Sequence, residues 1–412
     1  MSVKQRSGCA LCDSSRLDKI LSLASTPPAN EFVNSTERDQ TQECFPLDLL
    51  FCDDCGHVQL AHIVDPKRLF AHYVYVSGTS PVFVDHFVKY AAKLVSRFSL
   101  GGSDLVVEIG SNDGTLLKQL QRYGLTNVLG VDPAKKIADE ASIAGVPTIP
   151  SFFDSKLAVQ IRCDHGAVGA VIANNVFAHV EDLRDIAEGV KTLIGSKGFF
   201  VFEVSYFADV LRDLLFDTIY HEHTSYHTVR PLVSFFERLG MRLFDVERVD
   251  THGGSLRLYA CHESARYRTE PIVGSSIDNE INAGIFGRAI YTRFKERIAA
   301  QGTRLRGVLA DAKAAGKKVA GFGAPAKLTT LMYEFGLDGE DFQFIVDDSP
   351  SKQGLFTPGK HVAVVPSQML YERPDVQVCV VFAWNFFTAI MDKHPKWPGS
   401  FVNPISGETT GT

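Results

Sequence analysis

The sequence predicts an α/β fold in which a small cysteine-rich N-terminal domain precedes two Rossmann-like units. Three observations support this prediction. From residue 104 onward, short apolar runs alternate with helical patterns, as in a parallel sheet covered by helices. A strand–glycine–helix turn occurs twice, near Gly110 and near Gly321. Five of the eight cysteines lie within the first 55 residues. The expected domains are residues 1–75, 76–270 and 271–412.

The N-terminal part is expected to consist of short strands and loops, because it lacks a long helical period. In the middle part, residues 82–98 have helical spacing, and a further helix is expected at 234–241. Residues 242–262 read as two strands joined by a Gly-Gly turn. The other expected strands are 104–110, 127–133, 147–153, 166–180 and 198–207. The other expected helices are 111–124, 135–145 and 181–194.

The C-terminal part repeats the same alternation on a smaller scale. Residues 279–316 are expected to be helical, and 317–336 form a strand, a glycine turn and a helix. Three further strands are expected within 342–350, 361–370 and 376–384.

Composition excludes several classes of protein. The 412 residues are 45% hydrophobic and 22% charged, which excludes a largely disordered or collagen-like chain. The net charge is -6 and there is no basic stripe, so we expect no nucleic acid partner. No apolar run reaches the ~18 residues of a membrane span, and the N-terminus lacks the apolar region of a signal peptide. We therefore expect a cytoplasmic protein without a membrane partner. It is expected to be a monomer, because no exposed apolar helix stands out.

Two Cys-x-x-Cys pairs predict a zinc site. In a reducing compartment, clustered cysteines indicate metal ligands before disulfides. Four thiolates complete a closed tetrahedral shell, so the zinc would be structural. Free structural cysteines or a redox pair remain alternatives, and Cys44 or His57 could replace one ligand. The expected ligands are Cys9, Cys12, Cys52 and Cys55.

The first glycine turn predicts a nucleoside-containing cofactor. Glycine lets a ligand approach the backbone, and the following helix presents free N–H groups. Asp132 ends the next strand, where an acidic side chain can bind a ribose diol. The loop is GSNDG and not GxGxxG, and its carboxylates would repel a pyrophosphate. S-adenosylmethionine, with its positive sulfonium, fits better, although NAD or a turn without cofactor remain open. The candidate residues are Glu108, Gly110, Asn112, Asp113, Asp132 and Asn174.

A polar cluster, Tyr220-His221-Glu222-His223, suggests acid–base chemistry. Histidine titrates near neutral pH and is the commonest general base. If the segment is extended, His221 and His223 share one face. His179 follows the fourth core strand, at the edge of the sheet where such folds bind ligands. A metal site through the three histidines, or a structural polar loop, are alternatives.

The second glycine turn, Gly321 to Lys327, reads GxGxxA after a strand. It is a weak dinucleotide signal by itself. Lys327 and Lys352 could face a diphosphate, so the second unit could hold a nucleotide-activated substrate. A Rossmann-like domain without ligand is the alternative.

The order of motifs resembles a known family over about residues 9–390. After the two Cys-x-x-Cys pairs, the sequence is similar to NDP-sugar C-methyltransferases of the tylosin type, which make branched deoxysugars. Each motif is weak alone and specific in combination. The motifs are YVSGTS at 75–80, EIGSNDGTLL, NNVFAHVEDL, TIYHEH, GFGAPAK, DDSPSKQGLFTPGKHVAV and AWNF.

The resemblance implies a zinc-binding domain, a class I S-adenosylmethionine-dependent methyltransferase core and a C-terminal Rossmann-like α/β domain. It implies a nucleotide-linked 4-keto-6-deoxyhexose as substrate, methylated at C3 through an enolate. His223 would take the proton, and Glu222 and Tyr220 would orient it or the sugar. His179 and Tyr75, with Tyr73 as a less favoured substitute, would contact the ketone or a hydroxyl. Ser77 would join the cofactor site, and Asn385 the substrate site.

Other functions remain compatible with the sequence. The same chemistry at C5, or on another carbonyl substrate, would use the same residues. A zinc-ribbon interaction protein without activity, or a dehydrogenase with NAD on the GFGAPAK turn, belong to other classes.

Overall fold

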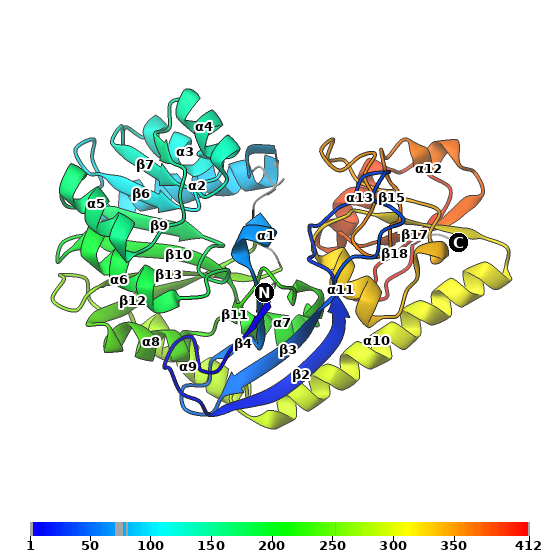
Figure 1. Ribbon diagram of the computed structural model, residues 1–412, viewed down its shortest axis with the longest axis horizontal. Coiled ribbons are helices and arrows are strands. Elements are labelled where there is room, and N and C mark those ends of the chain that lie inside the picture. Colours follow the sequence, from blue (N-terminus) through cyan, green and yellow to red (C-terminus); the bar gives the residue numbers. More distant parts are fainter. Residues whose placement is uncertain (1–2, 71–76, 80, 252, 411–412) are drawn as a thin grey trace.

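The computed structural model describes residues 3–70, 77–79, 81–251 and 253–410 (Figure 1). Its described strands form four sheets. The N-terminal sheet is antiparallel, in the order β11-β4-β3-β2, and β1 pairs with β5 beside it. Its strands are β2 (Leu17–Thr26), β3 (Phe45–Cys52), β4 (Val58–Leu60) and, from far along the chain, β11 (Ser225–Tyr226). The other N-terminal elements are β1 (Val3–Gln5), β5 (His62–Val64) and α1 (Pro66–Phe70). The expected strands and loops are present, but β2 has 10 residues and β3 has 8, and α1 is a short helix.

The core sheet has seven strands in the order β12-β13-β10-β9-β6-β7-β8. Five of them are parallel, and the antiparallel hairpin β12–β13 closes one edge. The buried apolar runs predicted from the sequence become these central strands. The strands are β6 (Val106–Ile109), β7 (Val128–Val131), β8 (Thr148–Ile149), β9 (Ala170–Asn174), β10 (Phe199–Ser205), β12 (Met241–Val249) and β13 (Ser255–His262).

Helices cover the core sheet, mostly where the sequence predicts them. Two short helices, α5 and α7, were not predicted. In α5 only Ala158 and Ile161 are buried, so its apolar pattern is weak, although the Asp154 carboxylate caps its first turn. The helices are α2 (Pro81–Phe98), α3 (Thr115–Arg122), α4 (Lys135–Ile143), α5 (Ser155–His165), α6 (Leu183–Ile194), α7 (Phe207–Asp213) and α8 (Val229–Arg238).

The C-terminal sheet has five parallel strands in the order β16-β15-β14-β17-β18. Its last strand, β18 (Ser400–Val402), was not predicted. The strands before it are β14 (Lys318–Phe322), β15 (Ile345–Val346), β16 (Val364–Val365) and β17 (Val376–Val381). Its helices are α11 (Lys327–Glu334), α12 (Met369–Glu372) and α13 (Phe387–Lys393).

The helical stretch before this sheet is two helices, α9 (Pro271–Asn282) and α10 (Arg288–Ala314). They are separated by a turn at Gly284, whose φ of 73° favours glycine. Helix α10 runs along one side of the molecule towards the C-terminal sheet (Figure 1). In the described part of the chain, no helix is both long and apolar enough to cross a membrane.

The N-terminal sheet joins the other two parts. One hydrophobic cluster contains side chains from β2 and β3, from α7 and from α11. The loop after β2 continues to the C-terminal sheet, where Val33 pairs with Phe356. Figure 1 shows this segment lying against the C-terminal lobe. The three parts therefore share packing and are not strung on free linkers.

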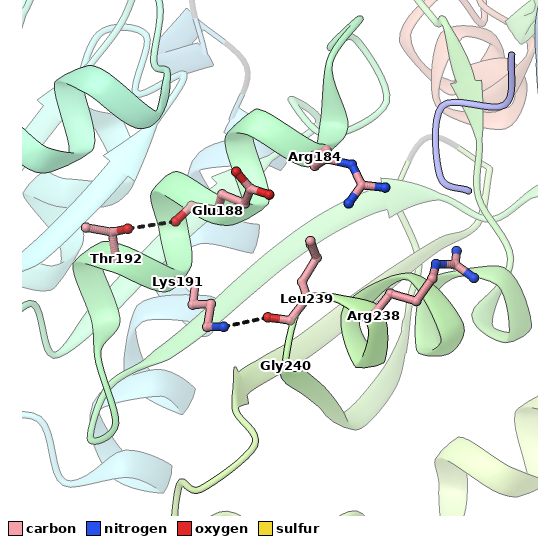
Figure 2. A pocket seen from close by; sticks show the side chains of 7 residues that line it. All are labelled: Arg184, Glu188, Lys191, Thr192, Arg238, Leu239 and Gly240. Carbon is pink, nitrogen blue, oxygen red and sulfur yellow. Dashed lines mark hydrogen bonds between the residues drawn. The ribbon is translucent and has the colours of Figure 1, made fainter. Parts of the chain in front are cut away.

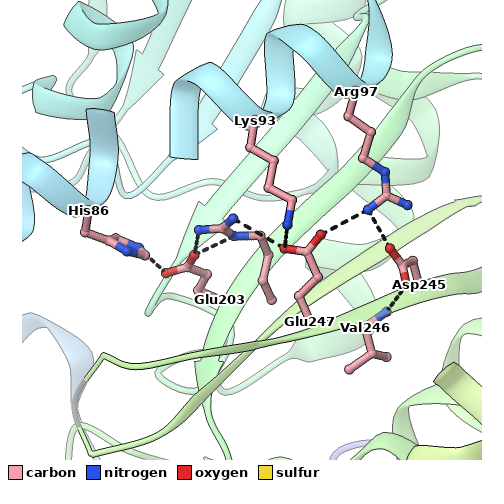
Figure 3. Close-up of polar contacts among 8 residues, drawn as sticks. His86, Lys93, Arg97, Glu203, Asp245, Val246 and Glu247 are labelled. Carbon is pink, nitrogen blue, oxygen red and sulfur yellow. Dashed lines mark hydrogen bonds and ion pairs between the residues drawn. The ribbon is translucent and has the colours of Figure 1, made fainter. Parts of the chain in front are cut away.

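A charged network fixes α2 to the core sheet (Figure 3). Glu203 on β10 is buried and accepts from His86 on α2 at 2.9 Å. On its other side, Glu203 pairs with Arg257 of β13 at 2.6 Å. Burial raises the pKa of Glu203, but His86 and Arg257 outweigh burial and hold this pKa below its usual value.

We predict that Arg257→Ala destabilises the protein by about 3–5 kcal/mol, because it leaves the carboxylate of Glu203 buried without its main partner. Chemical denaturation would measure this loss. Lys135→Ala is the control, since Lys135 is mostly exposed and pairs with the exposed Asp139 on the same helix. The control is expected to change stability by about 0.5 kcal/mol or less. Equal effects of the two substitutions would contradict the prediction.

Candidate functional site

The four cysteines of the two Cys-x-x-Cys pairs lie together. Their sulfur atoms are all within 4.8 Å of one another. Cys9 Sγ is 3.6 Å from Cys55 Sγ, and Cys12 Sγ is 3.5 Å from Cys52 Sγ. Ligands about 2.3 Å from a tetrahedral zinc are about 3.8 Å apart, so the cluster fits this ion without large adjustment. Among the described residues it is the only group of histidine, cysteine or acidic side chains close enough to hold a metal.

A surface hollow of about 510 Å3 lies between α6 and α8 (Figure 2). Next to it, the loop that carries Cys9 and Cys12 forms hydrogen bonds with the core. The three cations in this hollow have partners. Arg238 donates to Leu11 O and Arg184 to Asp13, both beside the cysteines. Lys191 donates to Leu239 O at 2.6 Å. The hollow therefore marks a structural contact between the cysteine loop and the core.

A larger cavity, of about 570 Å3, lies at the carboxyl ends of the parallel core strands. This is the edge where open α/β sheets bind ligands. The cavity is lined by residues of all three parts, including Asn30 and Pro66 from the N-terminal part and Lys327 and Lys352 from the C-terminal part. Its volume is within the usual range for ligand sites.

The first glycine turn forms one wall of this cavity. Gly110 has a φ of 68°, and a side chain here would collide with Val176. Asn112 also has a positive φ, of 50°, and its side chain accepts from Ser77 N at 2.9 Å. Ser77 and Asn112, two of the predicted cofactor-binding residues, both line the cavity.

Two acidic residues of the turn hold the loop itself. Asp132 accepts from Asn112 N at 2.8 Å and from Ala134 N at 2.9 Å while it lines the cavity. Asp113 accepts from Gly78 N at 3.1 Å and from Thr115 Oγ1 at 2.6 Å. Asp113 is not among the cavity-lining residues, so the structure gives it a role in positioning the loop.

Glu108 and Asn174 supply unsatisfied polar atoms at the end of the adjacent strands β6 and β9. Glu108 Oε2 and both polar side-chain atoms of Asn174 are buried without a hydrogen-bond partner of normal geometry among the described residues. Burial, reinforced by the charges of Asp113 and Asp132, raises the pKa of Glu108 well above its usual range. A buried carboxylate facing a cavity favours a positively charged ligand group.

The tyrosine–histidine segment is a turn and not an extended strand, so the condition under which His221 and His223 would share a face is not met. His223 N donates to Tyr220 O at 2.9 Å and closes the turn. His221 points away from the cavity, where its Nε2 contacts Phe45 O at 3.2 Å. His223 lines the cavity together with Tyr220 and Glu222.

Hydrogen bonds fix the tautomer of His223. Its Nδ1 is 2.7 Å from Thr218 O, and a carbonyl only accepts, so Nδ1 carries the proton. Its Nε2 therefore accepts from the Tyr220 hydroxyl at 3.0 Å. Burial, with a smaller effect from Lys327, lowers the pKa of His223 to about 4. His223 is thus neutral at pH 7. His179 lies beside it, with ring centroids 4.9 Å apart.

Glu222 is held by the N-terminal part of the chain. Asn30 Nδ2 donates to Glu222 Oε1 at 2.7 Å. Burial raises the pKa of Glu222 to about 7, and the hydrogen bond from Asn30 opposes this. The glutamate can therefore change its charge near neutral pH.

The second glycine turn faces the first across the cavity. Lys327 Nζ is 3.3 Å from Asn385 Oδ1, and Lys352 Nζ donates to Ala324 O at 2.9 Å. Both lysines line the cavity, whereas Asn385 does not. Asn385 therefore reaches the site only through Lys327. Asp347 accepts from Ala324 N and Ser349 N, just as Asp132 holds the first turn.

The sequence did not indicate several lining residues. Asn30 comes from the loop after β2 in the N-terminal domain, and Phe83 and Phe87 come from α2. Phe152 and Phe153 follow β8, so the rule of looking after each parallel strand could have found them. Tyr75 and its substitute Tyr73 lie outside the described residues.

Three family models match consecutive parts of the chain. One described as "Putative zinc binding domain" matches residues 9–70. "Methyltransferase domain" matches residues 84–246, and "C-methyltransferase C-terminal domain" matches residues 250–406. The fold and site thus define a methyltransferase with a zinc-binding domain.

Among characterised proteins, C-methyltransferase NovU of Streptomyces niveus is 35% identical over 405 residues, which are 96% of this chain and 95% of that protein. The chain belongs to the C-methyltransferase family.

Two solved structures resemble the core. Magnesium protoporphyrin IX methyltransferase of Synechocystis PCC 6803 with bound SAH has 18% identity and a TM-score of 0.35, and covers 48% of this chain and 91% of its own. A SAM-dependent methyltransferase of Anabaena variabilis has 15% identity and a TM-score of 0.36, with the same coverage. At these TM-scores they add nothing to the assignment.

The expected fold is confirmed: a class I S-adenosylmethionine-dependent methyltransferase core between a zinc-binding N-terminal domain and a C-terminal α/β domain. The predicted cofactors agree with the family and with the site. The four cysteines suit zinc, and the acidic turn at Glu108 suits the positively charged S-adenosylmethionine.

We predict that the purified protein contains about one zinc per chain and that Cys52→Ser removes it, because a closed shell needs all four thiolates. Elemental analysis would measure the metal. The variant is expected to lower Tm by about 5 °C or more, since metal binding stabilises the fold. Cys44→Ser is the control, because Cys44 is exposed and outside the cluster. Zinc retained in Cys52→Ser, or lost from the control, would contradict the assignment.

Proposed function

We propose that the protein is an S-adenosylmethionine-dependent C-methyltransferase that acts on C3 of a nucleotide-linked 4-keto-6-deoxyhexose. The observation that carries the proposal is one cavity with three kinds of group. A buried carboxylate, Glu108, lies at its core end, and two lysines, Lys327 and Lys352, lie at its C-terminal end. The neutral imidazole of His223 lines the same cavity.

The core end suits the cofactor and the C-terminal end suits the substrate. Glu108, Asn112, Asp132 and Asn174 would bind S-adenosylmethionine, whose ammonium and sulfonium favour nearby carboxylates. When bound, this cofactor supplies an electrophilic methyl group. The lysines would bind the diphosphate of the sugar nucleotide, because ammonium groups bind phosphate as point charges. This leaves the sugar next to His223.

His223 is the general base in this proposal. A proton on carbon next to a ketone is acidic enough to be removed, and Nε2 of His223 holds the lone pair that would accept it. The carbonyl of Thr218 keeps the other proton on Nδ1 and so fixes the ring. A pKa of about 4 keeps the imidazole unprotonated across the physiological pH range.

The enolate oxygen needs hydrogen-bond donors. The Tyr220 hydroxyl lies 3.0 Å from Nε2 and must turn away from it before Nε2 can take the substrate proton. It can then donate to the ketone oxygen, on which negative charge develops. His179, next to His223, would contact the ketone or a hydroxyl, and Glu222 would orient the sugar. Tyr75 is proposed for the same region from the sequence motif alone.

Two alternatives use the same cavity. Methylation at C5 differs only in which carbon beside the ketone faces Nε2. Another carbonyl substrate would leave the lysines without a diphosphate to bind. We further propose that the protein is a cytoplasmic monomer.

We predict that His223→Asn lowers turnover by about 10²–10⁴-fold, the usual contribution of a general base. NMR in deuterated water, with the keto sugar nucleotide and S-adenosylhomocysteine, would test the step directly. The native protein is expected to remove the C3 proton signal, and the variant is expected to leave it. Loss at C5 would move the methylation site to that carbon, and no exchange in the native protein would contradict the substrate class.

The control for this experiment is His221→Asn. His221 lies in the same turn but faces the N-terminal sheet. The substitution is expected to lower stability and to preserve exchange per folded molecule. Equal loss of exchange in both variants would mean that the turn, and not the His223 base, had been disrupted.

We also predict that binding of S-adenosylhomocysteine tightens as pH rises above the range in which a glutamate usually titrates. The pKa of Glu108 is raised well above its usual range, and its carboxylate form binds the ligand's ammonium. Glu108→Gln should remove this pH dependence and weaken binding by about tenfold or more. Calorimetry would measure both. Glu140→Gln, an exposed substitution on α4, is the control. A native affinity independent of pH would contradict the prediction.

A further inference from the structure

The mechanism above makes no use of Asp217, although its carboxylate is fully buried. Asp217 lies in the short helical turn Phe216–Thr218, one residue before the carbonyl that fixes His223. Trp384 of the C-terminal domain donates from Nε1 to Asp217 Oδ2 at 2.5 Å. The other oxygen, Oδ1, is buried without a hydrogen-bond partner among the described residues. Burying a carboxylate in this way is costly unless a cation compensates it.

Lys327 brings a cation to the same indole ring. Its Nζ lies 4.0 Å from the centre of the Trp384 ring, the same ring that binds Asp217. Asn385 accepts from Nζ at 3.3 Å. An ammonium has three donors and is attracted to the face of an indole ring, so these contacts fix its position. Lys327 also lines the cavity, so the fixed charge borders the ligand space.

We infer that Asp217 is a positioning residue that, with Trp384, keeps the Lys327 ammonium charged and directed at the diphosphate of the substrate. The diphosphate part of this inference rests on the proposed function. These contacts link two domains. Asp217 belongs to the core, whereas Trp384 and Lys327 belong to the C-terminal domain. The anion site would therefore exist only when the two domains are docked.

The electrostatics agree with this geometry. Burial lowers the pKa of Lys327, and the carboxylate of Asp217 opposes that effect. The pKa of Asp217 is itself raised by burial to about 6, so Asp217 is charged above that pH. The other titratable groups that line this end of the described cavity are Tyr220, His223 and Lys352. Asp347 lies behind the second glycine turn, with its carboxylate 4.0 Å from Lys352 Nζ. Glu222 lies further along, bound to Asn30.

Asp217→Asn tests the inference, because asparagine keeps an acceptor for Trp384 and removes the charge. Calorimetry with thymidine diphosphate, from pH 6.5 to 9, would compare the two proteins. We expect binding to weaken by about tenfold at pH 7.5 in the variant. The difference should grow as pH rises, because Lys327 loses its proton at a lower pH without Asp217. In turnover, KM is expected to rise more than kcat falls. S-adenosylhomocysteine binding should be unchanged and shows that the variant is folded.

Asp213→Asn is the matched control. Asp213 is exposed at the end of α7, the helix before Asp217, and pairs there with its neighbour Arg212. Trp384→Phe is a second variant, which keeps an aromatic ring beside Lys327 and removes the donor to Asp217. We expect it to weaken thymidine diphosphate binding in the same direction. Native-like binding by Asp217→Asn across the pH range would overturn the inference.

A second measurement separates this inference from the proposed function. Lysines methylated with ¹³C-formaldehyde and a borane reductant report their pKa by NMR, and Lys327→Arg identifies the signal. If the native protein binds no thymidine diphosphate, the proposed substrate class fails, but the Lys327 signal should still titrate at lower pH in Asp217→Asn. An unchanged titration of Lys327 would overturn the role of Asp217 whatever the substrate is.

Discussion

The turn between Thr218 and Tyr226 is held by all three domains, and the arrangement of the site depends on it. Strand β11 at its end pairs with β4 of the N-terminal sheet. The core holds it through Ser225 N and Ala178 O, 3.1 Å apart, and the C-terminal domain holds it through Thr330 Oγ1, which donates to Ile219 O at 2.8 Å. Because a closed turn with anchors on three sides has little freedom, the imidazole of His223 is oriented before any ligand arrives.

Through these contacts the zinc-binding domain helps to position the turn that carries His223, although the cysteine cluster does not line the cavity. The cysteine cluster orders the start of the N-terminal sheet, which carries β4. The loop after β2 brings Asn30 to Glu222 and continues to Phe356 of the C-terminal domain. A structural zinc can thus act on the site through the backbone that it stabilises.

Most of the fold could be predicted from the sequence because its signals are local. Apolar runs, glycine turns and Cys-x-x-Cys pairs each act over a few residues, and they identified the core sheet, the hairpin and the metal cluster. Local patterns could not find Asn30, Phe83 or the pairing of β11 with β4, which bring together distant parts of the chain. They also could not show that Tyr220–His223 forms a turn, because its shape depends on contacts with distant residues such as Phe45.

The two glycine turns show why residue type alone is a weak guide to a ligand. Asp132 and Asp347 occupy the same place after their strands, and each accepts two backbone N–H groups of its own loop. Such an aspartate stabilises its own loop whether or not a ribose is bound. The difference between the two ends of the cavity comes from their surroundings instead. The first turn lies beside the buried Glu108, whereas Lys327 and Lys352 flank the second. Since opposite charges at opposite ends orient a cation and an anion in one cavity, this arrangement suits the proposed pair of a positively charged methyl donor and a negatively charged substrate.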